Sequence, residues 1–147
     1  MSGRPPALIL VLAAAVAGAA ISIYLTISHY QQLPLACATS SLLDCNAVTT
    51  SGYSLLPGTG IPVSLLGVVW FAVSGSLGVL ALRRPHRLAW GSLLAAWGVV
   101  GAAFVLYLVY AELVVIHRIC EWCTAVHLLV VATLLAALTR VTRAAAT

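Results

Sequence analysis

Four long apolar runs dominate the pattern of hydrophobic and polar positions along the 147-residue chain. The runs are Ala7 to Ile27, Pro62 to Leu82, Leu88 to Ala111 and Ile119 to Leu138. Each is close to the roughly 20 apolar residues that a helix needs to cross the hydrocarbon core of a bilayer. Because lipid offers no hydrogen-bond partners, each run must satisfy its own backbone, which predicts four transmembrane helices. We expect residues 1–147 to form one four-helix membrane domain with a long outer loop between its first two helices.

The composition excludes a water-soluble fold. Hydrophobic residues make up 63% of the chain and charged residues only 7%, whereas soluble domains carry about 25% charged residues. The net charge of +4 does not indicate nucleic-acid binding, because the arginines lie at the ends of the apolar runs and not together on one polar face. The predicted class is therefore an all-α integral membrane protein.

The arginines are distributed unevenly between the two ends of the predicted bundle. One end, which also holds both termini, carries Arg4, Arg83, Arg84, Arg87, Arg140 and Arg143. The other end carries only Arg118. The positive-inside rule then places both termini in the cytoplasm, with residues 28–61 and the turn of residues 112–118 outside. We expect a multi-pass protein of a bacterial cytoplasmic (inner) membrane.

The four cysteines form two pairs, both at the predicted outer end. Cys37 and Cys45 lie in the long loop, and Cys120 and Cys123 form a Cys-Glu-Trp-Cys motif at the beginning of the fourth run. The space outside the bacterial cytoplasm is oxidising, and disulfides form and persist there. This partition into two pairs at one face is the main indication of function.

Three interpretations of the cysteines compete. Structural disulfides would suit Cys37 and Cys45, but a bridge between Cys120 and Cys123 would close a very short loop and restrict little chain entropy. A Cys₄ zinc site is the second interpretation. The spacing of Cys37 and Cys45 is looser than in zinc ribbons, and the oxidising side disfavours free thiolate ligands, so we expect no metal. The third interpretation is redox chemistry.

Redox chemistry suits the Cys120–Cys123 motif best. A pair at the beginning of a helix faces the positive end of the helix dipole, which stabilises a thiolate, the attacking species in disulfide exchange. Glu121 opposes this through its negative charge and Arg118 favours it, and the sequence leaves the balance open. Two pairs at one face suggest a relay, in which the loop pair meets a protein thiol and the helix pair reaches a lipophilic oxidant. A quinone is such an oxidant, and it explains why the protein lies in a membrane.

The order of these motifs is similar to that of a known family. The matching features are Cys37 and Cys45, Ser51 six residues after Cys45, Gly60-Ile61-Pro62, Ser64-Leu65-Leu66-Gly67 and Cys120-Glu121-Trp122-Cys123-Thr124. With these features the chain resembles, over essentially its whole length, the vitamin K epoxide reductase family. The resemblance implies a four-helix bundle around a quinone pocket, with the CxxC motif beside the quinone head group.

The resemblance also implies a role for each cysteine. Cys123 attacks the quinone, Cys120 exchanges with Cys45, and Cys37 faces the thiol partner. Bacterial members of the family reoxidise a DsbA-like protein of thioredoxin fold and so support disulfide formation outside the cytoplasm. Because the chain ends shortly after its fourth run, we expect a separate partner protein, with menaquinone or ubiquinone as the electron acceptor.

Four further positions follow from the resemblance. Members that reduce vitamin K bind it through an Asn on the second helix and a Tyr four residues after the CxxC motif, and the matching positions here are Val63 and His127. We therefore favour quinone reduction over epoxide reduction. His127 would donate to a quinone oxygen or, alternatively, hydrogen-bond with another helix. Ser51 would lie near the motif sulfurs or cap a short loop helix. Trp122 would shield the sulfurs beside the quinone or anchor the membrane interface.

Two other classes of protein remain as alternatives. A DsbB-like quinone reductase performs the same task in a different fold, but its CxxC motif lies in the first outer loop, and the order here is reversed. The other alternative is a non-catalytic tetraspanning membrane protein with structural disulfides. The absence of charged residues inside the apolar runs argues against an ion or solute path through such a protein.

Overall fold

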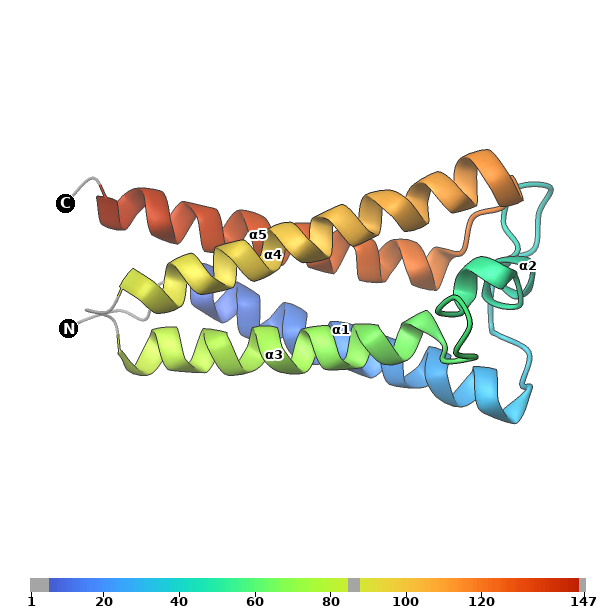
Figure 1. The fold of residues 1–147 in the computed structure, drawn as a ribbon, viewed down its shortest axis with the longest axis horizontal. Helices are drawn as coiled ribbons and strands as arrows, with labels where there is room; N and C mark the ends of the chain where they lie inside the picture. Colours follow the sequence, from blue (N-terminus) through green and yellow to red (C-terminus); the bar gives the residue numbers. More distant parts are fainter. Residues whose placement is uncertain (1–5, 85–87, 146–147) are drawn as a thin grey trace.

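The computed structural model describes residues 6–84 and 88–145 as a bundle of four long helices (Figure 1). They are α1 (Pro6–Gln31), α3 (Val63–Arg83), α4 (Leu88–Tyr110) and α5 (Glu121–Ala145). Four helical segments are long and apolar enough to cross a membrane, which confirms the predicted all-α membrane class. Arg4 and residues 85–87, on which part of the orientation prediction depends, lie outside the described residues.

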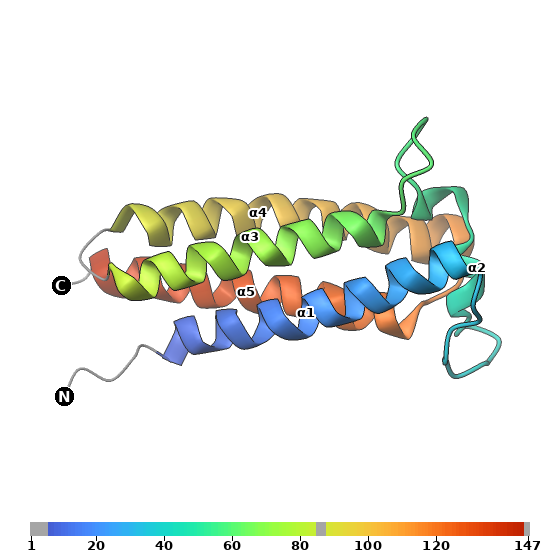
Figure 2. The same ribbon diagram turned by 90° about the horizontal axis from the view of Figure 1, so that it is seen from below.

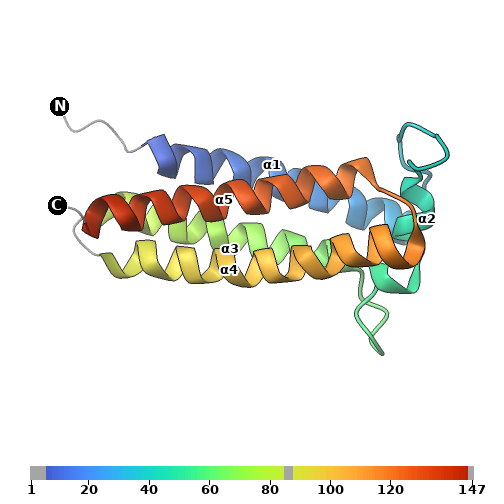
Figure 3. The ribbon, with the colours of Figure 1, turned by 90° about the horizontal axis from the view of Figure 1, so that it is seen from above.

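The helices form a closed ring in which α1 contacts α3 and α5, and α4 contacts the same two helices. The ends of α3 and α5 that carry Arg83 and Arg140 lie near the two termini, and the long loop lies at the opposite end (Figures 1 and 3). The half nearer the termini, here called the scaffold half, has a core of small and aliphatic side chains. These are Leu8, Val11, Leu77, Ala81, Leu94, Ala95, Ala136 and Ala137.

Glycines allow close helix packing at two crossings of this ring. A Cβ atom at Gly101 of α4 would stand 2.6 Å from the indole of Trp70 on α3. At Gly98 a Cβ would stand 3.0 Å from the side chain of Leu134 on α5. The absence of a side chain at both positions therefore sets how closely α4 approaches its neighbours.

The long loop covers the end of the bundle opposite the termini. It contains the short helix α2 (Cys45–Thr49) and the 3₁₀ helix η1 (Gly52–Ser54). Asp44 caps α2 by accepting a hydrogen bond from the Ala47 N–H at 2.9 Å. After η1, a hairpin closed by a bridge between Leu55 and Pro62 projects sideways from the bundle (Figure 2). We call this half of the molecule, with its loop, the site half.

The connection between α4 and α5 differs from the sequence prediction. Residues 112–118 were expected to form a turn, whereas Ala111–Ile116 continue α4 as a π-helix, η2. The carbonyl of Glu112 accepts hydrogen bonds from the N–H groups of both His117 and Arg118, and His117 ends the helix in the left-handed conformation at φ 55°. Such π-segments are rare and are often found at functional sites. Because α5 begins at Glu121, residues 119 and 120 precede the helix, contrary to the predicted boundary.

Candidate redox site

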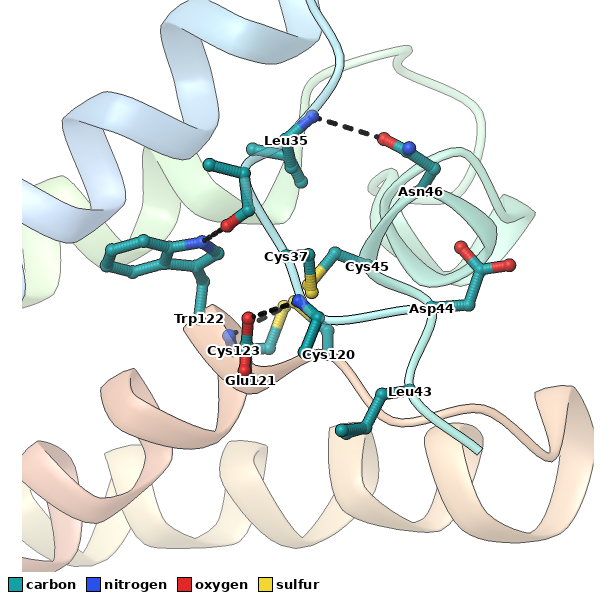
Figure 4. The surroundings of a disulfide bond; sticks show 12 residues. Leu35, Cys37, Leu43, Asp44, Cys45, Asn46, Cys120, Glu121, Trp122 and Cys123 are labelled. Carbon is teal, nitrogen blue, oxygen red and sulfur yellow. Dashed lines mark hydrogen bonds between the residues drawn. A yellow bond between two sulfur atoms is a disulfide. The ribbon is translucent and has the colours of Figure 1, made fainter. Parts of the chain in front are cut away.

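The four cysteines gather where the loop meets the beginning of α5 (Figure 4). Cys37 and Cys45 form a disulfide with their Cα atoms 6.1 Å apart, and Cys120 and Cys123 are free thiols. Cys45 and Cys120 are almost fully buried in one cluster, whereas Cys37 is half-buried. The structure thus shows the oxidised loop pair packed against the reduced motif.

A short backbone pairing fixes the register between the two pairs. Leu43 and Ile119 form an isolated parallel bridge. In it the Asp44 N–H donates to the Ile119 carbonyl at 3.1 Å, and the Ile119 N–H donates to the Leu42 carbonyl at 2.9 Å. Since neighbouring strands lie about 4.8 Å apart, this bridge aligns the stretch that leads into Cys45 with the stretch that leads into Cys120.

The environment of Cys120 favours its thiolate. A hydrogen bond from the Cys123 side chain is the largest cause that lowers the pKa of Cys120, and the backbone N–H groups of Cys123 and Trp122 lower it further. The Cys123 N–H lies 3.2 Å from the Cys120 sulfur. Burial and the negative charge of Glu112 raise the pKa, but less strongly, so it lies below that of an ordinary cysteine. Hydrogen bonds within the motif are thus the main cause of the lowered pKa of Cys120, and not Glu121 or Arg118, the two charges considered from the sequence.

Glu112 is a site residue that the sequence interpretation missed. It lies in the π-helix with only 5% of its surface exposed, and its Oε2 accepts a hydrogen bond from the Cys120 N–H at 3.3 Å. No ion pair involving Glu112 is found within residues 6–84 and 88–145. A carboxyl group next to a predicted apolar run was the available signal, because such groups at membrane depth are by default functional candidates.

A cavity of about 600 Å³ occupies the site half, between the four long helices and beneath the loop. Its lining is largely apolar and includes residues of α1, α2, α3, α4, η2 and α5. Cys123, His127, Ser51, Val63 and Glu112 all contribute to it. The cavity therefore brings Cys123 of the motif together with Ser51 and His127, two of the three residues at which cofactor contacts were expected, and with Val63, which stands at the position of the family's Asn.

His127 is buried, with 7% of its surface exposed, and it faces this cavity. Among the described residues we find no hydrogen-bond partner for its ring, so the alternative of a bond to another helix is not what the structure shows. Ser51 occupies the N-cap position of η1 but does not cap it; its hydroxyl donates to the Val48 carbonyl at 2.7 Å. Both side chains remain candidates for contact with a ligand in the cavity.

Trp122 lies outside the cavity lining, although it was expected beside the quinone. Its indole N–H donates to the Ala36 carbonyl at 2.7 Å, and its ring packs edge to face against Tyr24 with centroids 5.3 Å apart. The position of this side chain therefore connects the motif to the loop and not to the cavity.

One cluster in the site has the geometry of a metal site. The sulfurs of Cys37 and Cys45 and a carboxylate oxygen of Glu121 lie within 4.8 Å of one another. The two sulfurs are bonded to each other in this state, so they do not provide the thiolate ligands that a structural zinc ion requires.

Comparison with known proteins identifies the family of the chain. None of the curated proteins compared with the chain matches it. The family model of the vitamin K epoxide reductase family matches residues 9–138, which include all four cysteines and most of each long helix. The chain therefore belongs to the vitamin K epoxide reductase family and is a multi-pass membrane oxidoreductase with disulfide chemistry.

Proposed function

We propose that the protein takes electrons from a separate DsbA-like or thioredoxin-like protein and passes them through its two cysteine pairs to a quinone. The observation that carries this proposal is the position of the CxxC motif between two environments. Cys120 is buried against the loop disulfide, and Cys123 lines the cavity. One motif can therefore exchange with the loop pair on one side and reach a small molecule on the other.

The residues of the cavity fit a quinone. Its volume of about 600 Å³ lies in the usual range of roughly 300–1,000 Å³ for small-molecule sites, which are mostly apolar with a few polar groups. When bound there, menaquinone or ubiquinone would accept two electrons and two protons and become a quinol. Apolar residues such as Phe71 and Val130 would exclude water, and His127 would donate to a quinone oxygen.

The transfer between the pairs is an exchange of disulfides. A reduced loop pair meets an oxidised motif, and the Cys45 thiolate attacks the Cys120 sulfur, which releases Cys123 as a thiolate. Cys37 then attacks Cys45, re-forms the loop disulfide and releases Cys120. Two electrons have then moved from the loop pair to the motif. A disulfide between Cys37 and Cys45 beside two free motif thiols is the arrangement that this transfer would produce, and it supports the proposal.

The exposure of the loop cysteines supports Cys37 as the site of attack by the partner. Cys37 is half-buried, whereas Cys45 has only 1% of its surface exposed. A thiolate of a partner protein can therefore approach Cys37, and the mixed disulfide that forms there would release Cys45 toward Cys120.

The orientation follows from the arginines together with the fold. The described arginines near the termini are Arg83, Arg84, Arg140 and Arg143, and Arg118 lies at the cysteine end. By the positive-inside rule the cysteines face the outer side of a bacterial cytoplasmic membrane. A reporter that is active only outside the cytoplasm should work when fused after Thr39 and should fail when fused after Pro85. The reverse pattern would place the cysteines in the reducing compartment.

The function is tested with purified protein in lipid nanodiscs that contain menaquinone or ubiquinone. Addition of a reduced DsbA-like protein should produce quinol and oxidised partner in equal amounts. Formation of neither product, both with this partner and with a small dithiol in its place, would leave the non-catalytic alternative.

A further inference from the structure

Two aromatic side chains bind the backbone beside Cys37. The N–H of Ala36 donates to the Tyr24 hydroxyl at 3.2 Å, and the Ala36 carbonyl accepts from the Trp122 indole at 2.7 Å. The two aromatic rings also pack against each other. Residue 36 is therefore fixed by α1 on one side and by α5 on the other.

Glu121 binds the backbone on the other side of Cys37. Its Oε1 accepts a hydrogen bond from the Ala38 N–H at 2.8 Å. Figure 4 shows Glu121 and Trp122 extending from the beginning of α5 toward the stretch that carries Cys37. We use the name Cys37 clamp for Tyr24, Glu121 and Trp122 together with the three backbone groups that they bind.

This stretch of loop has no secondary structure to hold it. Residues 33–39 belong to no helix, strand or turn. An extended backbone must find partners for its N–H and C=O groups in water or in the protein. At residues 36 and 38 these partners are side chains of the clamp, two of which are the residues between the motif cysteines. The position of Cys37 therefore depends on the motif itself.

We propose that Tyr24, Glu121 and Trp122 are positioning residues for the exchange between the two cysteine pairs. The inference rests on the relay described above and identifies what completes it. The bridge between Leu43 and Ile119 holds the Cys45 side of the loop, and it remains when the disulfide is reduced because it is made of backbone groups. Cys37 then has no covalent link to Cys45.

The clamp keeps the free Cys37 thiol beside Cys45 at this stage. Cys37 can then attack the Cys45–Cys120 disulfide at the Cys45 sulfur, which forms the loop disulfide and releases the Cys120 thiolate. Attack requires close and oriented sulfurs, so a fixed Cys37 has a high effective concentration. Without the clamp, the Cys45–Cys120 disulfide should persist.

A Cys123→Ala protein isolates this equilibrium, because Cys45 can pair there with either Cys37 or Cys120. In a glutathione buffer, the two disulfides are distinguished by acid quenching, alkylation and gel mobility, since the Cys45–Cys120 bond closes a much longer loop. Trp122→Phe keeps the ring but removes the N–H, and Glu121→Leu removes the acceptor. The clamp bonds hold more firmly when Cys37 is tied to Cys45 than when it is free. Each loss should therefore shift the ratio toward Cys45–Cys120, by about tenfold at most, the value for the loss of one good hydrogen bond.

Glu121→Gln is the matched control. It removes the same negative charge from the first turn of α5 but keeps an oxygen that can accept from the Ala38 N–H, so its ratio should stay close to that of the parent. An unchanged ratio in Trp122→Phe and Glu121→Leu would overturn the positioning role.

Two further measurements distinguish positioning of Cys37 from support of the whole site. In the four-cysteine protein, Trp122→Phe should reduce quinone with a small dithiol at the parent rate, because that route does not use Cys37. Glu121→Leu should do so at the rate of Glu121→Gln, because both variants lack the charge beside the motif. An equal loss there would mean that the clamp supports the site as a whole and would overturn the inference. A Cys37→Ala, Cys123→Ala protein must form the Cys45–Cys120 bond. If both of its cysteines still react fully with the alkylating agent under oxidising conditions, the proposed relay is wrong, and the positioning role is wrong with it.

Discussion

The two halves of the bundle treat the space between their helices differently. In the scaffold half, Leu8, Val11, Ala81, Leu94 and Ala137 are fully buried and fill the centre. In the site half, the helices enclose a cavity of about 600 Å³ instead. Since protein interiors otherwise pack without large voids, the two halves differ in packing. The core of the scaffold half supplies stability, whereas the site half leaves the room in which we propose that the quinone binds.

The two halves also differ in the hydrogen-bond partners of their buried polar side chains. Deep in the bundle, Ser74 and Thr133 each donate to a carbonyl four residues earlier in their own helix, at 2.8 Å, so their polar groups are satisfied locally. In the site half, His127 faces the cavity without a partner among the described residues, and Glu112 binds the backbone of Cys120. Polar groups near the cavity are therefore directed at the motif and at the ligand space.

The largest expected effect distinguishes two routes by which electrons reach the CxxC motif, one through the loop pair and one from a small dithiol. Cys37→Ala or Cys45→Ala should reduce oxidation of the DsbA-like partner by about a thousandfold or more, because members of one catalytic pathway fail together. Quinone reduction by a small dithiol should change little, since that reductant can attack the motif disulfide at Cys123, which lines the cavity. Both rates are measured from quinol formation in nanodiscs. Equal losses by both routes would indicate that the loop disulfide is structural.

The second prediction compares the same substitution in the two halves. Leu94→Ala in the scaffold half should lower the free energy of unfolding by about 2–5 kcal/mol, as full burial of the lost side chain implies. Leu25 lines the cavity, so Leu25→Ala enlarges an existing space and should cost clearly less. Denaturing-detergent titration in mixed micelles measures both values. Equal losses in the free energy of unfolding would show that the site half is packed as firmly as the scaffold half.

The architecture could be predicted from the sequence because it follows from hydrophobicity. Four apolar runs with few charged residues leave helices as the only solution in lipid, and the helices begin and end within a few residues of the predictions at most boundaries. The extension of α4 through Ala111–Ile116 was missed. Hydrophobicity continues through Leu113–Ile116, but the sequence carries no mark of the change from α- to π-type hydrogen bonding.

The site could be predicted only in part. The structure joins Cys37 and Cys45 in a disulfide, a bonding state that the sequence left open. His127 and Cys123 line the cavity, while the roles that the family implies for them stay predictions. Trp122 was expected to shield the motif sulfurs or to anchor the membrane interface, and its role stays a prediction. A side chain at the beginning of a helix can face either the bundle or the loop, and here it faces the loop. Its contact with Ala36, 86 residues away, is a tertiary contact that no local pattern encodes.

The smallest expected effect concerns the thiolate of Cys120. It is measured in proteins with Cys37→Ala, Cys45→Ala and either Cys123→Ser or Cys123→Ala, in which Cys120 is the only thiol. The thiolate is the reactive form, so the rate of alkylation falls as the pH falls through the pKa. In a Cys123→Ser parent, the hydroxyl can replace the hydrogen bond that is the largest cause of the lowered pKa. Cys123→Ala removes that donor, so the pKa of Cys120 should rise and alkylation should slow at a fixed pH below it.

Glu112→Gln in the Cys123→Ser parent removes a negative charge that raises the pKa of Cys120. The variant keeps an acceptor for the Cys120 N–H, so the pH profile of alkylation should move in the opposite direction. Shifts of the same sign in both variants would mean that local distortion, and not hydrogen bonding and charge, controls the thiolate at the boundary between the loop and the cavity.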